Sequence, residues 1–230
     1  MRSIKQIILS AVIALFACNV NAQDTKHPDI VMPDHMTGKT MLVFGDSYVK
    51  NHRCPFEETW HYKVAQRHGM HYINAGRNGS SIAFDRTRDG FGPSMLTRLE
   101  ELTDSADYVI IIAGHNDADK IKNSTDSLVM FRTAMDSLCR RLVDKYPDAR
   151  IAFVTPWNVD RPGFGPVIST IVEVCHAHSI PVLRADQESG IHVRSEAFRR
   201  RFFQGGDTAH LNADGHNLIL NWADRFISGL

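Results

Sequence analysis

The clearest buried strand in the sequence is Tyr108-Val109-Ile110-Ile111-Ile112-Ala113, a continuous apolar run rich in β-branched residues. Such a run is typical of a central strand in a parallel sheet, because helices cover both faces of that sheet. Shorter apolar runs predict further strands at 41–44, 72–74, 150–155 and 180–183. Their alternation with helical segments predicts a single-domain three-layer α/β/α fold, with a flavodoxin-like parallel sheet of about five strands.

Helices are expected between these strands and at the end of the chain. The stretch from about 124 to 145 ends near Pro147, a second helix covers 166–178, and a terminal helix begins at Ala213. A chain of 230 residues with 26 basic and 26 acidic side chains is long enough for one well-packed core. The balanced charge gives no reason to expect nucleic acid or an anionic membrane surface as a partner.

The first 22 residues resemble a secretory signal peptide. Arg2 and Lys5 precede the apolar stretch 7–16, and Val20-Asn21-Ala22 suits signal peptidase. We therefore expect a secreted or periplasmic protein with no integral membrane segment after processing. The run 15–18 also resembles a bacterial lipobox. The alternative is therefore a lipoprotein that is anchored to a membrane through Cys18.

The segment 23–40 is polar in its first part and carries Pro28 and Pro33, which predicts a leader arm ahead of the folded domain at 41–230. The chain shows no repeat and no second domain. Its sequence does not indicate an oligomeric state.

A serine follows the first predicted strand, in the motif Gly45-Asp46-Ser47-Tyr48. Ligands bind open α/β sheets at the carboxyl ends of the strands, so the hydroxyl of Ser47 is expected to face a crevice. Taken alone, the motif is better explained by Asp46 or Ser47 capping the next helix. The rest of the sequence decides between these interpretations.

The motif Asp207-Thr208-Ala209-His210 supplies a base and the carboxylate that would orient it. A serine hydroxyl becomes a nucleophile when a base takes its proton, and a carboxylate at Nδ1 fixes the tautomer of that base. His216 and Asp214 are the rival base and acid. We rank them lower because their place inside the terminal helix makes the sheet edge harder to reach.

Two loops are able to supply donors for a tetrahedral oxyanion. The first is the glycine-rich turn 75–80, which follows the second predicted strand and contains Gly76 and Gly79. The second is Gly114-His115-Asn116-Asp117, directly after the central strand, so that the amide of Asn116 is expected at the same sheet edge as Ser47.

These four motifs, in this order, resemble those of the SGNH hydrolases of the GDSL esterase/lipase superfamily. The resemblance spans Gly45 to His210 and implies a serine hydrolase of ester bonds. It makes Ser47 the nucleophile and an oxyanion donor, Asn116 a second donor through its side chain, and His210 the base supported by Asp207. It makes the N–H of Gly79 the third donor, with Gly76 as the competing assignment.

Neither a cofactor nor a metal is expected. The cluster Cys175-His176-Ala177-His178 is a single group, whereas structural zinc sites use two pairs of ligands at short spacing. The scattered histidines, namely His52, His61, His68 and His71, are interpreted as surface and core-edge residues. Removal of a signal peptide would leave three cysteines, and this odd count argues against a disulfide framework. The helical patterns around Cys139 and Cys175 predict buried thiols, and Cys54 lies in the loop after the serine.

The functional hypothesis is an exported esterase that hydrolyses short-chain acyl esters, acetyl in particular, on a carbohydrate or a small molecule. Polar loops at 50–53, 85–89 and 157–161 favour a polar substrate over a lipid tail. Tyr48 would narrow the pocket and Trp157 would offer a face to a sugar ring, although Trp157 is explained equally well as a packing residue. The alternatives are a lysophospholipase or thioesterase of the same superfamily, and a non-catalytic carbohydrate-binding relative.

Overall fold

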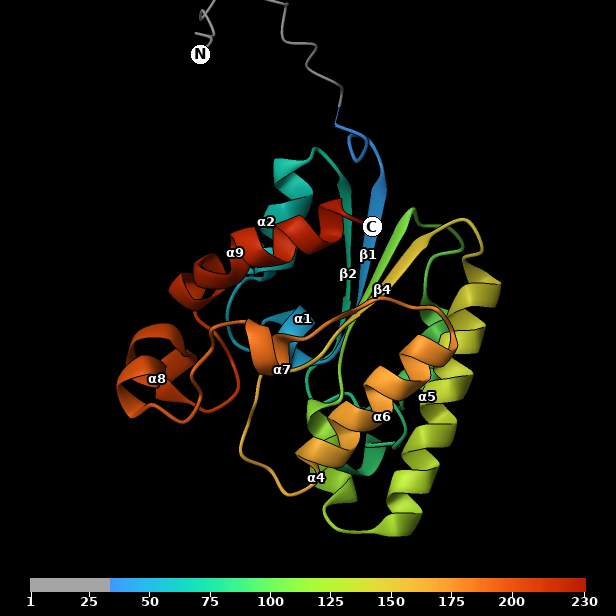
Figure 1. The fold of residues 1–230 in the computed structure, drawn as a ribbon, viewed down its shortest axis with the longest axis vertical. Coiled ribbons are helices and arrows are strands. Elements are labelled where there is room, and N and C mark those ends of the chain that lie inside the picture. Colours follow the sequence, from blue (N-terminus) through green and yellow to red (C-terminus); the bar gives the residue numbers. More distant parts are fainter. Residues whose placement is uncertain (1–33) are drawn as a thin grey trace, which may run out of the picture. The chain divides into compact units, whose positions relative to one another are not determined.

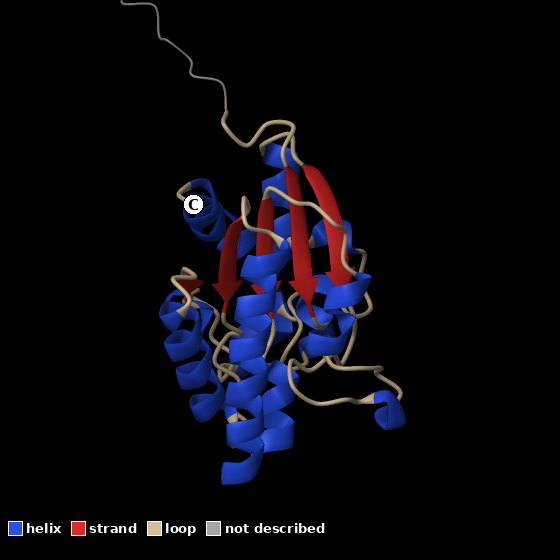
Figure 2. Cartoon of the chain, turned by 90° about the vertical axis from the view of Figure 1, so that its right-hand side faces the viewer, coloured by secondary structure: helices blue, strands red, loops and turns tan. Residues whose placement is uncertain are grey.

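Five parallel strands form one sheet in the order β2-β1-β3-β4-β5 (Figure 2). Their bounds are β1 (Thr40–Gly45), β2 (His71–Gly76), β3 (Tyr108–Ile112), β4 (Arg150–Val154) and β5 (Val182–Leu183). This is the strand order of flavodoxin-like sheets. The structure is a computed structural model in which residues 34–230 are described.

Helices cover both faces of the sheet (Figure 1). On one side, α2 (Trp60–Arg67) packs against α9 (Ala213–Ser228), and on the other, α5 (Thr125–Lys145) packs against α6 (Phe164–Ala177) and α4 (His115–Ile121). The remaining helices are short: α1 (Ser47–Lys50), α3 (Met95–Arg98), α7 (Ala185–Glu188) and α8 (Glu196–Phe202). Single 3-10 turns lie at Phe56–Glu58, Thr87–Asp89, Leu99–Glu101 and Gln204–Gly206. The predicted three-layer α/β/α fold is confirmed.

The strand order determines where a ligand is expected. From β1 the chain moves outward to β2 on one side, and then returns to add β3, β4 and β5 on the other side. The loops that follow β1 and β3 therefore leave the sheet in different directions, and ligands of doubly wound folds bind outside such carboxyl ends. Residues Ser47 and Asn116 follow these two strands.

Every residue of β3 is buried, as its unbroken apolar sequence predicts. In the register of the sheet, Val43 of β1 lies beside Ile110, which lies beside Ala152 of β4. The other predicted strands and the helices at 125–145, 164–177 and 213–228 are all present, with ends shifted by a few residues. The strand β2 extends to Gly76, so that the turn predicted at 75–80 begins later than expected.

The folded unit begins at Asp34, before the predicted start at residue 41. Met36 is completely buried in the core, and the N–H of Gly38 donates to the carbonyl of Gly69 at 3.0 Å. Residues 34–40 therefore belong to the domain and not to the leader arm. The predicted signal peptide, the rest of the arm and Cys18 lie outside the described residues. Among the helices of residues 34–230, none is long and apolar enough to cross a membrane.

Candidate active site

Ser47 is the first residue of α1, directly beyond the end of β1. Asp46 caps this helix by accepting a hydrogen bond from the N–H of Tyr48 at 2.9 Å. Gly45 permits the close approach of β1 to β3 here, because a Cβ atom would lie 2.2 Å from the carbonyl oxygen of Ile112. The chain thus turns directly from β1 into α1, which places Ser47 beyond the carboxyl end of the strand.

The structure brings the predicted base and acid to this serine. Nε2 of His210 lies 2.9 Å from the Oγ of Ser47, and Nδ1 of His210 lies 2.6 Å from the Oδ2 of Asp207. The other carboxylate oxygen, Oδ1, accepts from the backbone N–H groups of Ala209 at 2.9 Å and His210 at 2.8 Å. The three side chains form one continuous hydrogen-bonded chain of the kind used for nucleophilic catalysis.

The carboxylate of Asp207 is stabilised in its ionised form. Burial alone would raise its pKa, but the hydrogen bonds from the His210 side chain and from two backbone amides outweigh burial and lower the pKa. An ionised Asp207 requires a proton on Nδ1 of His210, which leaves Nε2 free to accept the proton of Ser47.

The residues on either side of Gly79 are hydrogen-bonded to His52 and to Asn116. Asn78 Nδ2 donates to the carbonyl of His52 at 3.3 Å, and the carbonyl of Ser80 accepts from Asn116 Nδ2 at 2.9 Å. Gly79 has φ of +70°, and a Cβ atom there would lie 2.1 Å from the ring of Phe91, so only glycine fits this position.

Gly76 has a different environment from Gly79. It is the last residue of β2, and its N–H donates to the Oδ1 of Asn74 at 2.9 Å. A Cβ atom on Gly76 would lie 2.3 Å from the backbone nitrogen of Lys50, so this glycine allows α1 to pack on the strand. No hydrogen bond occupies the N–H of Gly79 within the described part of the chain. This difference favours Gly79 over Gly76 as an oxyanion donor.

The comparisons agree with this geometry. The model of the GDSL-like lipase/acylhydrolase family matches residues 43–218. The chain belongs to this family. The SGNH resemblance of its four motifs is thereby confirmed, and membership of the GDSL-like family implies an enzyme that hydrolyses esters. None of the curated proteins matches the chain.

Several solved structures share the GDSL-like fold. A protein from Lactobacillus plantarum has 19% identity and a TM-score of 0.72, over 85% of this chain and 99% of that one. The lipase/acylhydrolase from Enterococcus faecalis has 20% identity and a TM-score of 0.60, over 83% and 96%. The aryl esterase of M. smegmatis has 16% identity and a TM-score of 0.63, over 84% and 100%.

Two buried carboxylates support the GDSL-like site, and the sequence did not reveal their roles. Oδ2 of Asp46 accepts from Asn116 Nδ2 at 3.2 Å, and burial raises the pKa of Asp46 to about 7. Asp117 accepts from Ser81 Oγ at 2.5 Å and from the N–H groups of Ile82 at 2.9 Å and Ala83 at 3.0 Å. Asp46 thus positions Asn116, and Asp117 shapes the backbone that follows Gly79.

Arg98 is a second unpredicted support for the loops. This buried guanidinium donates to the Oγ of Ser80 at 2.9 Å and to the carbonyl of Ala75 at 2.7 Å. It also donates to the carbonyl of Gly45 at 3.4 Å. Arg98 therefore joins the ends of β1 and β2 to the loop that carries Gly79.

The predicted substrate-binding role of Tyr48 and Trp157 does not fit their surroundings. Each ring is only 3% exposed, and the two stack with centroids 4.1 Å apart. The Tyr48 hydroxyl lies 2.8 Å from Nδ1 of His115, and Trp157 Nε1 donates to the carbonyl of Ala209 at 2.8 Å. Neither ring presents a free face to a ligand, and together they pack behind the loop that carries His210.

The rival base is also excluded by its surroundings. His216 is buried, its Nε2 lies 3.2 Å from Asn51 Oδ1, and burial lowers its pKa well below the usual value. Asp214 lies in the first turn of α9. Burial likewise lowers the pKa of His61 to about 3, so this histidine is a neutral part of the core.

One group of side chains among the described residues has the composition of a metal site, and its geometry does not fit one. His52, Asp207 and His210 bring possible ligand atoms within 4.8 Å of one another. The two imidazoles, however, stack face to face with centroids 4.1 Å apart and 9° between their planes. A metal bound by imidazole nitrogen lies near the ring plane. Two nearly parallel rings stacked in this way cannot share one ion without reorientation. The side chains of the sequence cluster 175–178 do not converge, because Cys175 is buried while Nε2 of His178 lies 2.8 Å from Asp136.

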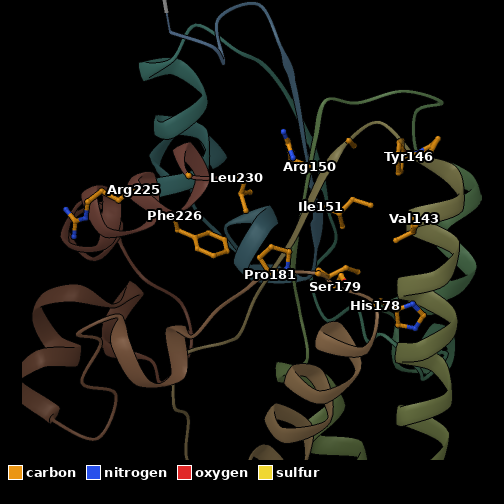
Figure 3. Close-up of a pocket in the computed structure, with 14 residues that line it drawn as sticks. Val143, Tyr146, Arg150, Ile151, His178, Ser179, Pro181, Arg225, Phe226 and Leu230 are labelled. Atoms are coloured by element: carbon orange, nitrogen blue, oxygen red, sulfur yellow. The ribbon is translucent and has the colours of Figure 1, made fainter. Parts of the chain in front are cut away.

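Two of the cavities in the structure differ in their position relative to Ser47. The larger, of about 570 Å³, lies between α5, the amino end of β4 and the end of α9, with Val143, Arg150 and Phe226 around it (Figure 3). It therefore opens at the end of the sheet opposite to Ser47. A cavity of about 480 Å³ borders the site itself. Its lining combines polar and apolar surface and comprises His52, Arg53, Cys54, Phe203, Gln204, Gly205, Asp207 and Asn212.

Proposed function

We propose that this chain is an exported serine esterase that removes short acyl groups, acetyl in particular, from a polar alcohol such as a carbohydrate. The observation that carries the proposal is the chain of hydrogen bonds from Asp207 through His210 to Ser47, with distances of 2.6 Å and 2.9 Å. It supplies a nucleophile, a base in the correct tautomer and an orienting carboxylate at one place.

In the proposed mechanism, Oγ of Ser47 attacks the ester carbonyl while Nε2 of His210 accepts its proton. The negative charge that develops on the carbonyl oxygen is met by the N–H groups of Ser47 and Gly79 and by the side chain of Asn116. His210 then returns the proton to the departing alcohol, which leaves the acyl group on Ser47. A water molecule, activated by the same histidine, hydrolyses this acyl-enzyme and restores the serine.

The substrate class is inferred from the walls of the site. The cavity beside His52 and Asp207 has polar side chains in its lining, including the charged Arg53, next to the apolar Phe203. Phe91 is the exposed aromatic side chain against the loop that carries Gly79. Within residues 34–230, the helix that precedes the loop of His210 is α8, and its seven residues are few for a lid over a lipid tail. These surroundings favour a short acyl group on a hydrophilic alcohol.

The experiment that tests the activity is labelling with a fluorophosphonate probe. The wild-type protein should be labelled and Ser47→Ala should not. If folded wild-type protein remains unlabelled, the non-catalytic carbohydrate-binding alternative takes precedence.

A second measurement tests the acyl preference. The value of kcat/KM should be higher for p-nitrophenyl acetate than for p-nitrophenyl decanoate, because charged and polar side chains line part of the cavity beside the site. A preference for decanoate would replace the proposal with a lysophospholipase or thioesterase. If acetate is preferred instead, the hydrolysis of acetylated glycans would show whether the natural alcohol is a carbohydrate.

A further inference from the structure

We propose that His52 is a positioning residue, which holds the imidazole plane of His210 by stacking on it. This inference rests on the proposed function, since it assigns His210 the role of base. The two ring centroids are 4.1 Å apart and the planes differ by 9°. The ring of Tyr48 approaches His210 at 80°, with centroids 6.1 Å apart. His210 is therefore in contact with aromatic rings in two orientations.

The position of His52 is imposed by an unusual backbone. Asn51 and the following His52 both have left-handed conformations, with φ of 67° and 51°. Asparagine and histidine adopt this region more often than most residues, but it still has a cost for any residue other than glycine, and such conformations persist where the surroundings determine them. Two consecutive left-handed residues turn the loop after α1 back over the site.

The same loop is tied to the segment that carries the base. Gln204 Nε2 donates to the carbonyl and to Oδ1 of Asn51, at 3.2 Å and 3.1 Å. The backbone N–H of Gln204 donates to the carbonyl of His210 at 2.8 Å, and Asn51 Nδ2 donates to the carbonyl of Pro55 at 2.6 Å. Gln204 thus fixes the spacing between the loop of His52 and the loop of His210.

The contribution of the His52 ring is stacking and not hydrogen bonding. Within residues 34–230, neither ring nitrogen of His52 has a hydrogen-bond partner, and only its carbonyl accepts a bond, from Asn78. Burial, followed by the nearby His210 and Arg53, lowers the pKa of His52, so a neutral ring faces the base. A neutral imidazole stacks on another without charge repulsion.

Stacking restricts a tilt of the His210 ring that its two hydrogen bonds still allow. Hydrogen bonds at Nδ1 and Nε2 hold two points of the ring. The ring is still able to tilt about the line through these two atoms, which moves the Nε2 lone pair out of line with Ser47. A parallel ring against one face opposes this tilt. His52 should therefore increase the fraction of time during which the base is aligned.

The test compares three substitutions, because the left-handed backbone offers a matched control. His52→Gly satisfies the backbone and removes the ring, His52→Asn does the same with a side chain that tolerates positive φ, and His52→Phe keeps an aromatic ring without nitrogen. With p-nitrophenyl acetate, His52→Gly and His52→Asn should lower kcat roughly 3- to 10-fold, the range expected for an aromatic pair. KM should change less than twofold. His52→Phe should stay within twofold of the wild type.

The rate of fluorophosphonate labelling at Ser47 should follow kcat through this series, while the unfolding temperatures of the glycine and wild-type proteins stay close. Wild-type kcat in both His52→Gly and His52→Asn would overturn the proposal. A kcat in His52→Phe as low as in His52→Gly would also overturn it, because the ring nitrogen would then be required. A change confined to KM would make His52 a substrate contact instead. Absence of turnover and labelling in the wild type would refute the proposed esterase function itself.

Discussion

Replacing Asn116 by alanine tests the proposed oxyanion donor, and the structure separates the expected loss of rate from the expected loss of stability. Both N–H groups of the Asn116 amide are already used, one by the Ser80 carbonyl at 2.9 Å and one by Asp46 Oδ2 at 3.2 Å. An oxyanion above Ser47 would compete for the longer bond, the one to Asp46. The donor is therefore held in place before the reaction and redirected only in the transition state.

The expected magnitudes follow from this arrangement. Loss of one oxyanion donor typically costs about 3–4 kcal/mol, so kcat for p-nitrophenyl acetate should fall about 10²–10³ in Asn116→Ala. KM should change little, because the amide meets the oxygen mainly in the transition state. The folded protein also loses two hydrogen bonds, each contributing about 0.5–1.5 kcal/mol, so the free energy of unfolding should fall by roughly 1–3 kcal/mol.

The matched control is Asp46→Asn. This side chain keeps an oxygen for the N–H of Tyr48, but turns an amide nitrogen toward the nitrogen of Asn116. It should loosen Asn116 without removing it, and the loss in kcat should be smaller than in Asn116→Ala. The assay is steady-state hydrolysis at several substrate concentrations, with urea unfolding in parallel. A rise in KM with unchanged kcat in Asn116→Ala would refute the reasoning and make Asn116 a ground-state substrate contact.

Two further predictions concern the catalytic unit and the core. Ser47→Ala, His210→Ala and the double variant should each lose roughly 10⁴–10⁶ in kcat, with little added loss in the double, because the residues act as a unit; independent losses that multiply would contradict this assignment. The loss in kcat should be smaller for Asp207→Asn than for Ser47→Ala or His210→Ala, because the proposed role of Asp207 is to orient His210. Burial lowers the pKa of His61 and of His115 from 6.5 to about 3, so both stay neutral in the folded protein where the unfolded chain binds protons. The stabilisation that the two neutral histidines contribute is therefore fully present above pH 6.5, and the free energy of unfolding should fall by roughly 1 kcal/mol per pH unit for each histidine as the pH drops toward 3. Urea unfolding at pH 7, 6 and 5 measures this dependence on pH. The substitution His61→Asn should reduce its slope, and an unchanged slope would contradict the prediction.

The sequence predicts the architecture because the strands are apolar enough to be recognised alone. The run at 108–112 has no polar residue apart from the Tyr108 hydroxyl, and strands alternate with helices throughout. The end of β2 was harder to place, since Asn74-Ala75-Gly76 has the small and polar composition of a turn. Its pairing with β1, as between Gly45 and Gly76, depends on the neighbouring strand. Local composition does not reveal that neighbour.

The candidate site was predictable to the extent that its residues follow strands. Ser47 comes directly after β1, and Asn116 lies in the first turn of α4, close behind β3. Gly79 follows β2 by a few residues. In a parallel sheet, residues that follow the strands lie at the same end of the sheet, beyond the carboxyl ends of the strands. His210 lies in a loop between α8 and α9, so its proximity to Ser47 rested on the motif resemblance and not on the topology.

The surroundings of the base were not predictable, because they come from side chains whose contacts cross the chain. The sequence left open whether Trp157 packs or binds a ligand, and its partner in the structure is Tyr48, a buried ring more than a hundred positions earlier. His52 carries no signal in its own sequence, since the left-handed backbone that turns it toward His210 is maintained by Asn51 and by the distant Gln204. Short motifs therefore indicate the candidate reacting groups, whereas loop contacts over long sequence distances determine how those groups are held. The substitutions at His52 measure that second contribution separately from the first, because they leave Ser47, His210 and Asp207 in place.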